Sequence, residues 1–167
     1  MTSARFESPV GRLVLTAKNG ALVSVMWAGT ATPEGGDDLD PVLREACAQL
    51  SAYFAGRLTR FDLPLAPAGT PFRQRVWAAM AAIPYGQTLT YGDIARALGT
   101  APRAVGGACG ANPLPIIIPC HRVVGGNGPG GYSGARGLAT KHWLLAHEGA
   151  IVPHEKQRSF ENIARVG

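Results

Sequence analysis

Apolar and polar residues alternate near the amino terminus, which is the pattern of half-buried β-strands. Arg5–Phe6 and Leu13–Thr16 follow this period, and Ser8–Gly11 between them is rich in turn-forming residues. Asn19-Gly20 is a strong hairpin signal because both residues tolerate a positive φ angle, and Ala21–Trp27 follows it as a third strand. We therefore predict a small antiparallel sheet.

A helix is predicted after the loop rich in Gly, Pro and Asp that follows this sheet. Asp40 can cap the first turn, Pro41 fits the first helical position, and Gly56 ends the helix. We predict an edge strand at Phe61–Leu63 and a linker at Leu65–Gly69. The apolar face of the helix, assigned to the core, comprises Leu43, Ala46, Cys47, Leu50, Tyr53 and Phe54.

The spacing of apolar residues is helical after the linker. Thr70-Pro71 repeats the capping pair, and Pro84 ends this helix. The change of pattern divides the chain into an amino-terminal α/β lobe, residues 1–68, and a mostly helical carboxy-terminal domain, residues 69–167. The predicted fold class is α/β of the α+β type. The apolar positions of the new helix are Phe72, Val76, Met80 and Ile83.

Two short helices with a tight turn, Thr90–Gly99 and Arg103–Ala111, predict a helix-turn-helix. The second helix contains three glycines and has almost no side chain that could read base edges. Such a smooth helix favours close, sequence-independent approach to a DNA backbone, although small residues serve tight helix packing equally well. Arg103 is its one long cationic side chain, and Cys109 is assigned to packing.

Candidate chemistry is concentrated in Asn112–Val123, which reads N-P-L-P-I-I-I-P-C-H-R-V. The β-branched run Ile116–Ile118 predicts a buried strand. Cys120 follows it, and His121 and Arg122 supply a base and a positive charge. Because a cysteine is nucleophilic as a thiolate, this neighbourhood favours a reactive thiol. A buried structural cysteine is the alternative.

The chain's positive charge is unevenly distributed. Of the 167 residues, 16 are Lys or Arg and 11 are Asp or Glu, which gives a net charge of +5. The first 67 residues carry six basic and seven acidic side chains, so the whole excess lies with the Cys-His stretch. A basic lobe suits a polyanionic partner, although it also serves solubility.

The residues around Cys120 resemble the active-site signature of the O6-alkylguanine-DNA alkyltransferases, also called methylated-DNA–protein-cysteine methyltransferases. The signature is Pro119–Val123, preceded by Asn112-Pro113 and followed by Tyr132-Ser133-Gly134. The resemblance has specific motifs from about Phe72 to Gly149 and is weaker from about Phe6 to Phe61.

This resemblance implies a single-turnover DNA repair methyltransferase. It would flip O6-alkylguanine, and less well O4-alkylthymine, out of duplex DNA and transfer the alkyl group irreversibly to Cys120. The implied partner is double-stranded DNA carrying O6-alkylguanine. No cofactor, metal or membrane is implied, and we expect a monomer.

The family resemblance also implies the catalytic roles. His121 would take the thiol proton through a water, and Glu148 would complete a Cys-His-Glu arrangement. Glu148 shares a helix face with Leu144, so it needs a buried partner there. Alternatively, Glu148 is exposed at a frayed helix end, because Gly149 follows it. Tyr91 would help to rotate the nucleotide and donate a proton to the leaving base.

DNA and base contacts are implied by the same resemblance. Arg103 would fill the space of the extruded nucleotide, beside Ala104 and Gly107 on the small-residue helix. Asn112 would tie the helix-turn-helix to the Cys120 segment.

The base itself would be bound by four residues. Ser133 would contact guanine O6, Tyr132 would form the pocket wall, and the carbonyls of Cys120 and Val123 would accept the exocyclic amine. The loop Ala135–Gly137 is about two residues longer than the family pattern, which affects the predicted alkyl pocket.

Three other functions fit parts of the pattern. A lesion-sensing relative would bind alkylguanine without transfer, but such relatives lack the cysteine. A transcriptional regulator would need an amino-terminal metal domain, and residues 1–67 contain one cysteine and no histidine. A cysteine hydrolase would turn over repeatedly, whereas a thioether product allows one reaction.

Cysteine usage and hydropathy predict a cytoplasmic location. Three cysteines at unrelated spacings suggest reduced thiols rather than a disulfide framework. Arg5 and Glu7 fall where a signal peptide would be apolar, and no apolar run approaches the roughly 20 residues of a membrane span.

Overall fold

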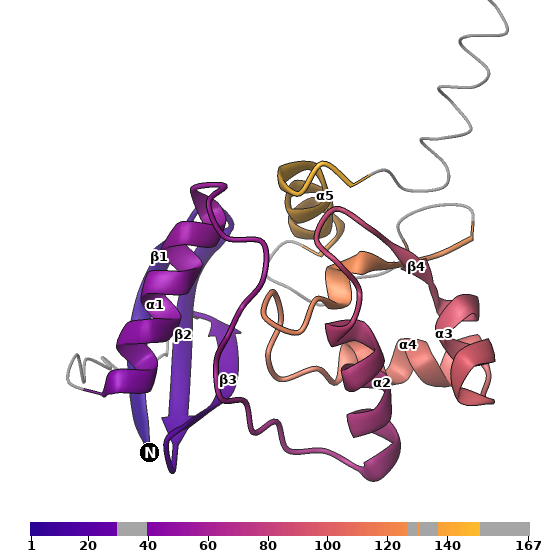
Figure 1. Cartoon of the computed structure of the whole chain (residues 1–167), viewed down its shortest axis with the longest axis horizontal. Coiled ribbons are helices and arrows are strands. Elements are labelled where there is room, and N and C mark those ends of the chain that lie inside the picture. Colours follow the sequence, from indigo (N-terminus) through magenta and orange to yellow (C-terminus); the bar gives the residue numbers. More distant parts are fainter. Residues whose placement is uncertain (30–39, 127–129, 131–136, 151–167) are drawn as a thin grey trace, which may run out of the picture.

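The computed structural model describes residues 1–29, 40–126, 130 and 137–150. Two groups of elements lie side by side (Figure 1): a three-stranded sheet with one helix, and a cluster of helices from the second half of the chain. This arrangement confirms the predicted fold class. None of the described helices is long and apolar enough to cross a membrane.

The sheet consists of β1 (Thr2–Ser8), β2 (Gly11–Lys18) and β3 (Ala21–Trp27), paired antiparallel in that order. Asn19 and Gly20 have φ angles of 52° and 76°, as the predicted hairpin turn requires. Alternate residues of β2 point to the covered face. These residues are Leu13, Leu15 and Ala17, all buried.

Helix α1 (Pro41–Phe54) packs on this sheet. The Asp40 side chain accepts a hydrogen bond from the Val42 N–H at 2.9 Å, and Gly56 after the helix has a φ of 76°. The predicted helix and both of its end signals are therefore confirmed. The predicted inward face is also confirmed, with Leu43, Ala46, Leu50 and Tyr53 fully buried and Cys47 and Phe54 packed against the core.

The prediction of an edge strand at Phe61–Leu63 was wrong, because the pairing occurs a few residues later. The Leu22 N–H donates to the Pro64 carbonyl at 2.8 Å, and the Ala66 N–H donates to the Leu22 carbonyl at 2.9 Å. Leu65 thereby forms a parallel bridge with Leu22. Proline can serve here because the bond uses its carbonyl and not the N–H that it lacks. The predicted linker therefore begins as a partner of β3.

Three helices follow: α2 (Pro71–Ala81), α3 (Tyr91–Leu98) and α4 (Pro102–Gly110). Thr70 and Thr90 cap α2 and α3 through their hydroxyl oxygens. Gly99, in the left-handed conformation, ends α3, and α4 packs against both earlier helices. The helix pair of the predicted helix-turn-helix is thus present.

The prediction of a strand at Ile116–Ile118 was also wrong. All three side chains are buried, but the backbone turns: the Ile118 N–H donates to the Leu114 carbonyl at 2.8 Å, and Ile116 has a φ of 73°. A β-branched residue rarely adopts this left-handed conformation, so the surrounding packing must impose it. Burial, rather than strand pairing, accounts for the three isoleucines.

A small parallel ladder joins β4 (Leu89–Thr90) to β5 (Val123–Val124). The last described helix, α5 (Leu138–His147), lies at the junction of the two groups (Figure 1). One apolar core cluster includes residues from both halves of the chain. The division into residues 1–68 and 69–167 therefore stays a prediction.

Gly69 should not tolerate a side chain, because a Cβ there would overlap Cη2 of Trp77 and lie 2.7 Å from its Cζ3. Trp77 is buried, and its Nε1 donates to the Ala108 carbonyl at 2.8 Å, so the ring cannot easily move. We expect Gly69→Ala to lower the free energy of unfolding by about 1–3 kcal/mol in urea denaturation.

Gly110→Ala is the matched control, since no atom lies within 4 Å of a Cβ at that position. We expect this substitution to raise stability by about 0.5 kcal/mol through helix propensity. Equal stabilities of Gly69→Ala and the wild-type protein would contradict the packing argument.

Candidate active site

Cys120 begins a short 3-10 turn, Cys120–Arg122, directly after the buried isoleucine turn. Its side chain is buried, and its N–H donates to the Ile118 carbonyl at 2.8 Å. Asn112, just after α4, braces this segment. Its Nδ2 donates to the Ile118 carbonyl at 2.8 Å, and its Oδ1 accepts from the Leu114 N–H at 3.0 Å. Asn112 thus links α4 to the backbone that carries Cys120.

His121 and Glu148 form a fully buried pair. His121 Nε2 lies 2.7 Å from Glu148 Oε2, although 27 residues separate them in the chain. Glu148 is the C-cap residue of α5 and is 5% exposed. The alternative prediction of a solvated glutamate at a frayed helix end was therefore wrong. The other ring nitrogen, Nδ1, has no hydrogen-bond partner among the described residues. Nδ1 is therefore the nitrogen that can take up a proton.

Arg122 neutralises the buried carboxylate. Its Nε donates to Glu148 Oε1 at 2.8 Å and its Nη2 donates to Glu148 Oε2 at 3.0 Å, which is a two-pronged ion pair. Its Nη1 donates to the Ile83 carbonyl at 2.7 Å, just beyond α2. The guanidinium also lies over the Tyr85 ring, 5.8 Å from its centroid. Arg122 thus ties together segments that are far apart in sequence.

Tyr53 of α1 donates from its hydroxyl to Glu148 Oε2 at 2.6 Å. Sequence reasoning assigned this side chain to the apolar core and missed the bond. Its helical spacing correctly indicated burial, but no sequence signal shows where a buried hydroxyl points. A buried hydroxyl generally requires a partner, and that requirement was the only available hint.

The pKa values of the pair follow from burial and these bonds. Burial raises the pKa of Glu148, but the bonds from His121 and Arg122 outweigh it and hold that pKa well below its ordinary range. Burial is also the main cause that lowers the pKa of His121, and the bond to Glu148 only partly opposes it. The pair therefore exists at neutral pH as a carboxylate and a neutral imidazole.

Tyr91 is the first residue of α3 and follows β4 directly. The parallel ladder pairs Thr90 with Val124 and Leu89 with Val123, so it holds Tyr91 near the Cys120 turn. Burial, and then Cys109 and Cys120, raise the pKa of Tyr91 to about 12. The hydroxyl is protonated at neutral pH and can act as a donor.

Lys141 of α5 is a second residue that sequence reasoning missed. It is fully buried, and its Nζ donates to the Val123 carbonyl at 2.6 Å and to the Tyr91 hydroxyl at 3.5 Å. Burial lowers the pKa of Lys141 to about 8, and Cys120 and Cys109 oppose this shift. A lysine in an apolar helix pattern at the site's edge was the available signal.

The predicted DNA-facing residues lie on one exposed side of α4. Arg103 and Gly107 are exposed and Ala104 is partly buried, whereas Cys109 is buried with its Sγ 3.3 Å from Met80 Sδ. A Cβ at Gly107 would meet no atom within 4 Å. Tight helix packing therefore does not explain that glycine, and the assignment of Cys109 to packing holds.

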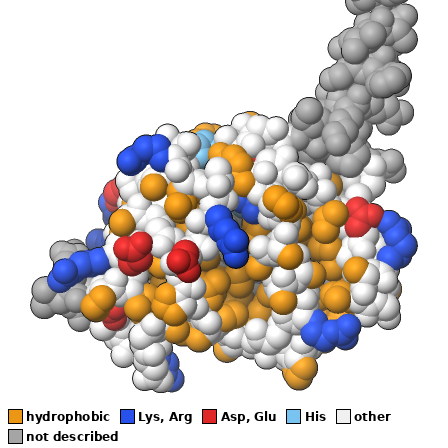
Figure 2. Space-filling model, viewed as in Figure 1, with side chains coloured by type: hydrophobic (Ala, Val, Ile, Leu, Met, Phe, Trp, Pro, Cys, Tyr) orange, Lys and Arg blue, Asp and Glu red, His pale blue; other side chains and the backbone are white. Residues whose placement is uncertain are grey.

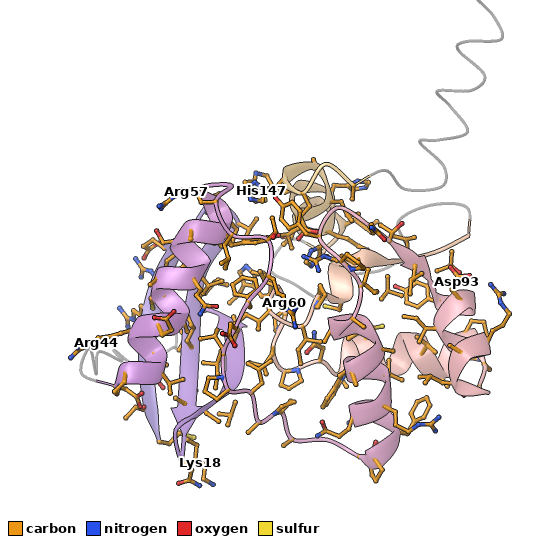
Figure 3. The ribbon with its side chains drawn as sticks, viewed as in Figure 1. Lys18, Arg44, Arg57, Arg60, Asp93 and His147 are labelled. Carbon is orange, nitrogen blue, oxygen red and sulfur yellow. The ribbon has the colours of Figure 1, made fainter. Side chains whose placement is uncertain are left out.

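A hollow of about 720 Å³ opens on the face shown in Figure 2, between the segment Thr59–Leu65 and the end of α2. Apolar side chains line much of it, and Arg60, labelled in Figure 3, also contributes. Pro119 and Arg122 are among its lining residues, but Cys120 and Tyr91 are not. The hollow is therefore not the predicted alkyl pocket.

Three predicted features lie wholly or partly outside the described residues: Tyr132, Ser133 and the longer loop at 135–137, of which only Gly137 is described. In the described part of the chain, no cluster of three His, Cys, Asp or Glu side chains could hold a metal ion.

The two halves of the chain match models of one protein family. The model described as 6-O-methylguanine DNA methyltransferase, ribonuclease-like domain, matches residues 1–67. The model described as 6-O-methylguanine DNA methyltransferase, DNA binding domain, matches residues 71–150.

Individual relatives agree with these matches. A methylated-DNA–protein-cysteine methyltransferase of Methanosarcina acetivorans is 46% identical over 157 residues, covering 90% of this chain and 99% of the relative. The structure of Mycobacterium tuberculosis OGT in complex with DNA is 42% identical with a TM-score of 0.80, covering 89% of this chain and 93% of that one. An O6-methylguanine DNA methyltransferase of Methanococcus jannaschii is 32% identical with a TM-score of 0.67, covering 89% and 95%. The chain therefore belongs to the 6-O-methylguanine DNA methyltransferase family.

Proposed function

We propose that this protein repairs double-stranded DNA by moving the alkyl group of O6-alkylguanine onto Cys120, once per molecule. The observation that carries the proposal is the buried bond of 2.7 Å between His121 and Glu148, next to Cys120 in the chain. This geometry leaves Nδ1 of a neutral imidazole to accept the thiol proton, which a nucleophilic cysteine requires. Family membership supplies the substrate.

In the proposed reaction the Cys120 proton passes to His121 Nδ1 through a water molecule. The sulfur attacks the alkyl carbon, so an S–C bond forms as the bond between that carbon and guanine O6 breaks. The electron pair of the broken bond remains on the base, and Tyr91 donates a proton to it. The buried ammonium of Lys141 is positioned to favour both the thiolate and this donation.

Recognition of the flipped base is proposed for the residues that the family pattern indicates. The Val123 carbonyl already accepts from Lys141, but a carbonyl has two lone pairs and can also accept the guanine amine. Cys120 offers a second carbonyl, and Tyr132 and Ser133 would complete the pocket. O4-alkylthymine is the proposed poorer substrate.

Duplex binding is proposed for the exposed side of α4. Arg103 would enter the duplex where the nucleotide leaves, and Ala104 and Gly107 would let the helix approach the backbone closely. Asn112 would transmit the position of α4 to the Cys120 segment through its two bonds. We infer a cytoplasmic monomer whose residues 69–167 carry both reaction and DNA binding.

The first test is intact-mass and peptide mapping after mixing the protein with a duplex carrying one O6-methylguanine. We expect one added methyl group on Cys120, saturating at one per protein, and none in Cys120→Ser. Binding of the duplex without methyl gain would instead indicate a lesion sensor. Repeated turnover without a modified cysteine would indicate a hydrolase.

The rate of transfer should depend on the protonation of His121, because only the neutral imidazole can act as a base. Burial lowers the pKa of His121 from its ordinary value of 6.5, so the base stays neutral down to that pH. We expect single-turnover rates to change little between pH 7.5 and 6.5, where Lys141, whose pKa is about 8, stays mostly protonated. The rate should fall only at a pH below 6.5, by up to tenfold per pH unit (about 1.4 kcal/mol). A rate that already halves at about pH 7.5 would contradict the assignment.

A bulky side chain at Gly107 should weaken DNA binding without unfolding the protein, because the added atoms meet open space. We expect Gly107→Leu to reduce duplex affinity about tenfold at fixed salt concentration, or roughly 1.4 kcal/mol. The control is Ala55→Leu, an exposed position after α1. Unchanged affinity of Gly107→Leu in fluorescence anisotropy would rule out this face.

A further inference from the structure

Among the described hydrogen bonds to the Glu148 side chain, the one from Tyr53 comes from the amino-terminal lobe. Tyr53 lies at the end of α1, 95 residues from Glu148 in the chain, and its side chain is fully buried. Around it are the rings of Phe54, Phe61, Tyr85 and His147, with centroids 5.1 to 6.2 Å away. This packing fixes the ring, and thereby fixes the direction of the hydroxyl.

The two carboxylate oxygens of Glu148 accept different numbers of hydrogen bonds. Within the described residues, Oε1 accepts one hydrogen bond, from Arg122 Nε at 2.8 Å. Oε2 accepts three, from the Tyr53 hydroxyl at 2.6 Å, His121 Nε2 at 2.7 Å and Arg122 Nη2 at 3.0 Å. A carboxylate oxygen has two lone pairs, so three donors on Oε2 must share them. Tyr53 and His121 therefore compete for the same electron density.

Besides His121 and Arg122, which bond Oε2 themselves, three titratable side chains lie around the network, Tyr85, His147 and Lys141, and their described hydrogen bonds go to other atoms. Arg122 compensates the carboxylate charge, and Lys141 acts on His121 only through space. The Tyr85 hydroxyl donates to the His147 carbonyl at 3.3 Å. His147 Nε2 lies 2.7 Å from the Tyr53 carbonyl, which anchors α5 to the end of α1. The groups facing Tyr53 and Glu148 are thus His121, Arg122, Tyr85, His147 and Lys141.

We propose that Tyr53 is a positioning residue of the alkyl-transfer site, through which the amino-terminal lobe sets how strongly Glu148 binds His121. The inference rests on the function proposed above. Because the Tyr53 hydroxyl donates to Oε2, it weakens the hydrogen bond and the charge attraction between the carboxylate and a protonated His121 imidazole. It also keeps the carboxylate turned toward Nε2, so that Nδ1 points to the Cys120 side.

This arrangement has a chemical purpose. A bare carboxylate against a buried histidine would favour the imidazolium form, and an imidazolium cannot accept the thiol proton. Because Oε2 also accepts a hydrogen bond from the neutral Tyr53 hydroxyl, the His121 imidazole stays unprotonated at neutral pH while its ring remains oriented. A tyrosine that served only to fill the core would need no hydroxyl at this position.

The test is Tyr53→Phe, which removes the hydroxyl and keeps the ring. The single-turnover rate of methyl transfer to Cys120 is measured from pH 5 to 8.5. We expect the acid limb of the profile to move to higher pH by about one unit, because His121 becomes more basic. At pH values above the acid limb, the rate of Tyr53→Phe should stay within about twofold of the wild-type rate.

Tyr85→Phe is the matched control, since it removes a hydroxyl from the same aromatic cluster that does not bond Glu148. Both variants should lose some thermal stability, but only Tyr53→Phe should move the acid limb. An unmoved limb in a folded Tyr53→Phe protein would overturn the proposal and leave Tyr53 as a packing residue.

A second measurement does not depend on transfer or on a variant that folds. In the wild-type protein, the short bond of 2.6 Å predicts a protected Tyr53 hydroxyl proton far downfield in the NMR spectrum. Its shift should follow the titration of the His121 ring. A hydroxyl resonance that does not respond to that titration overturns the inference, whereas absence of methyl transfer by the wild-type protein overturns the proposed function instead.

Discussion

Burial of the Glu148 carboxylate is the constraint on which the rest of the site depends. An ionised carboxylate removed from water is costly unless its charge is compensated and its lone pairs are filled. Arg122 supplies the charge with a two-pronged ion pair, and His121 and Tyr53 supply further donors. Removing one partner would leave a buried charge under-compensated, so these side chains act as a unit.

This unit draws on elements from the whole chain. Tyr53 comes from α1, the Ile83 carbonyl lies just beyond α2, His121 and Arg122 form the 3-10 turn, and Glu148 caps α5. The described core cluster likewise runs through both halves of the chain. The amino-terminal sheet and helix therefore do more than support the second half, because they contribute a donor to the reactive site itself.

Local chemistry made much of the fold predictable from sequence. Threonine or aspartate before proline marked helix starts, and glycines with left-handed φ angles marked helix ends. The family signature indicated Cys120 and His121, and the bond to Glu148 agrees with the expected pairing. Predictions failed where tertiary packing overrides local preference. Ile116 adopts a positive φ inside a buried turn, and Pro64 offers a carbonyl to β3. The orientations of the Tyr53 hydroxyl and the Lys141 ammonium depend on residues far away in the chain, so no local pattern could indicate them.

The reactive cysteine sits on a segment with little regular structure of its own. A single 3-10 turn has few internal hydrogen bonds, and their geometry is poorer than in an α-helix. The turn alone therefore cannot hold the cysteine sulfur in a fixed direction. Its position is set from outside: Asn112 braces the backbone before it, Lys141 holds the Val123 carbonyl after it, and the Glu148 network holds the two side chains within it. Because displacement at carbon requires close alignment of the attacking sulfur, such external anchoring supplies orientation in advance. The same reasoning explains why so many buried polar groups surround one thiol.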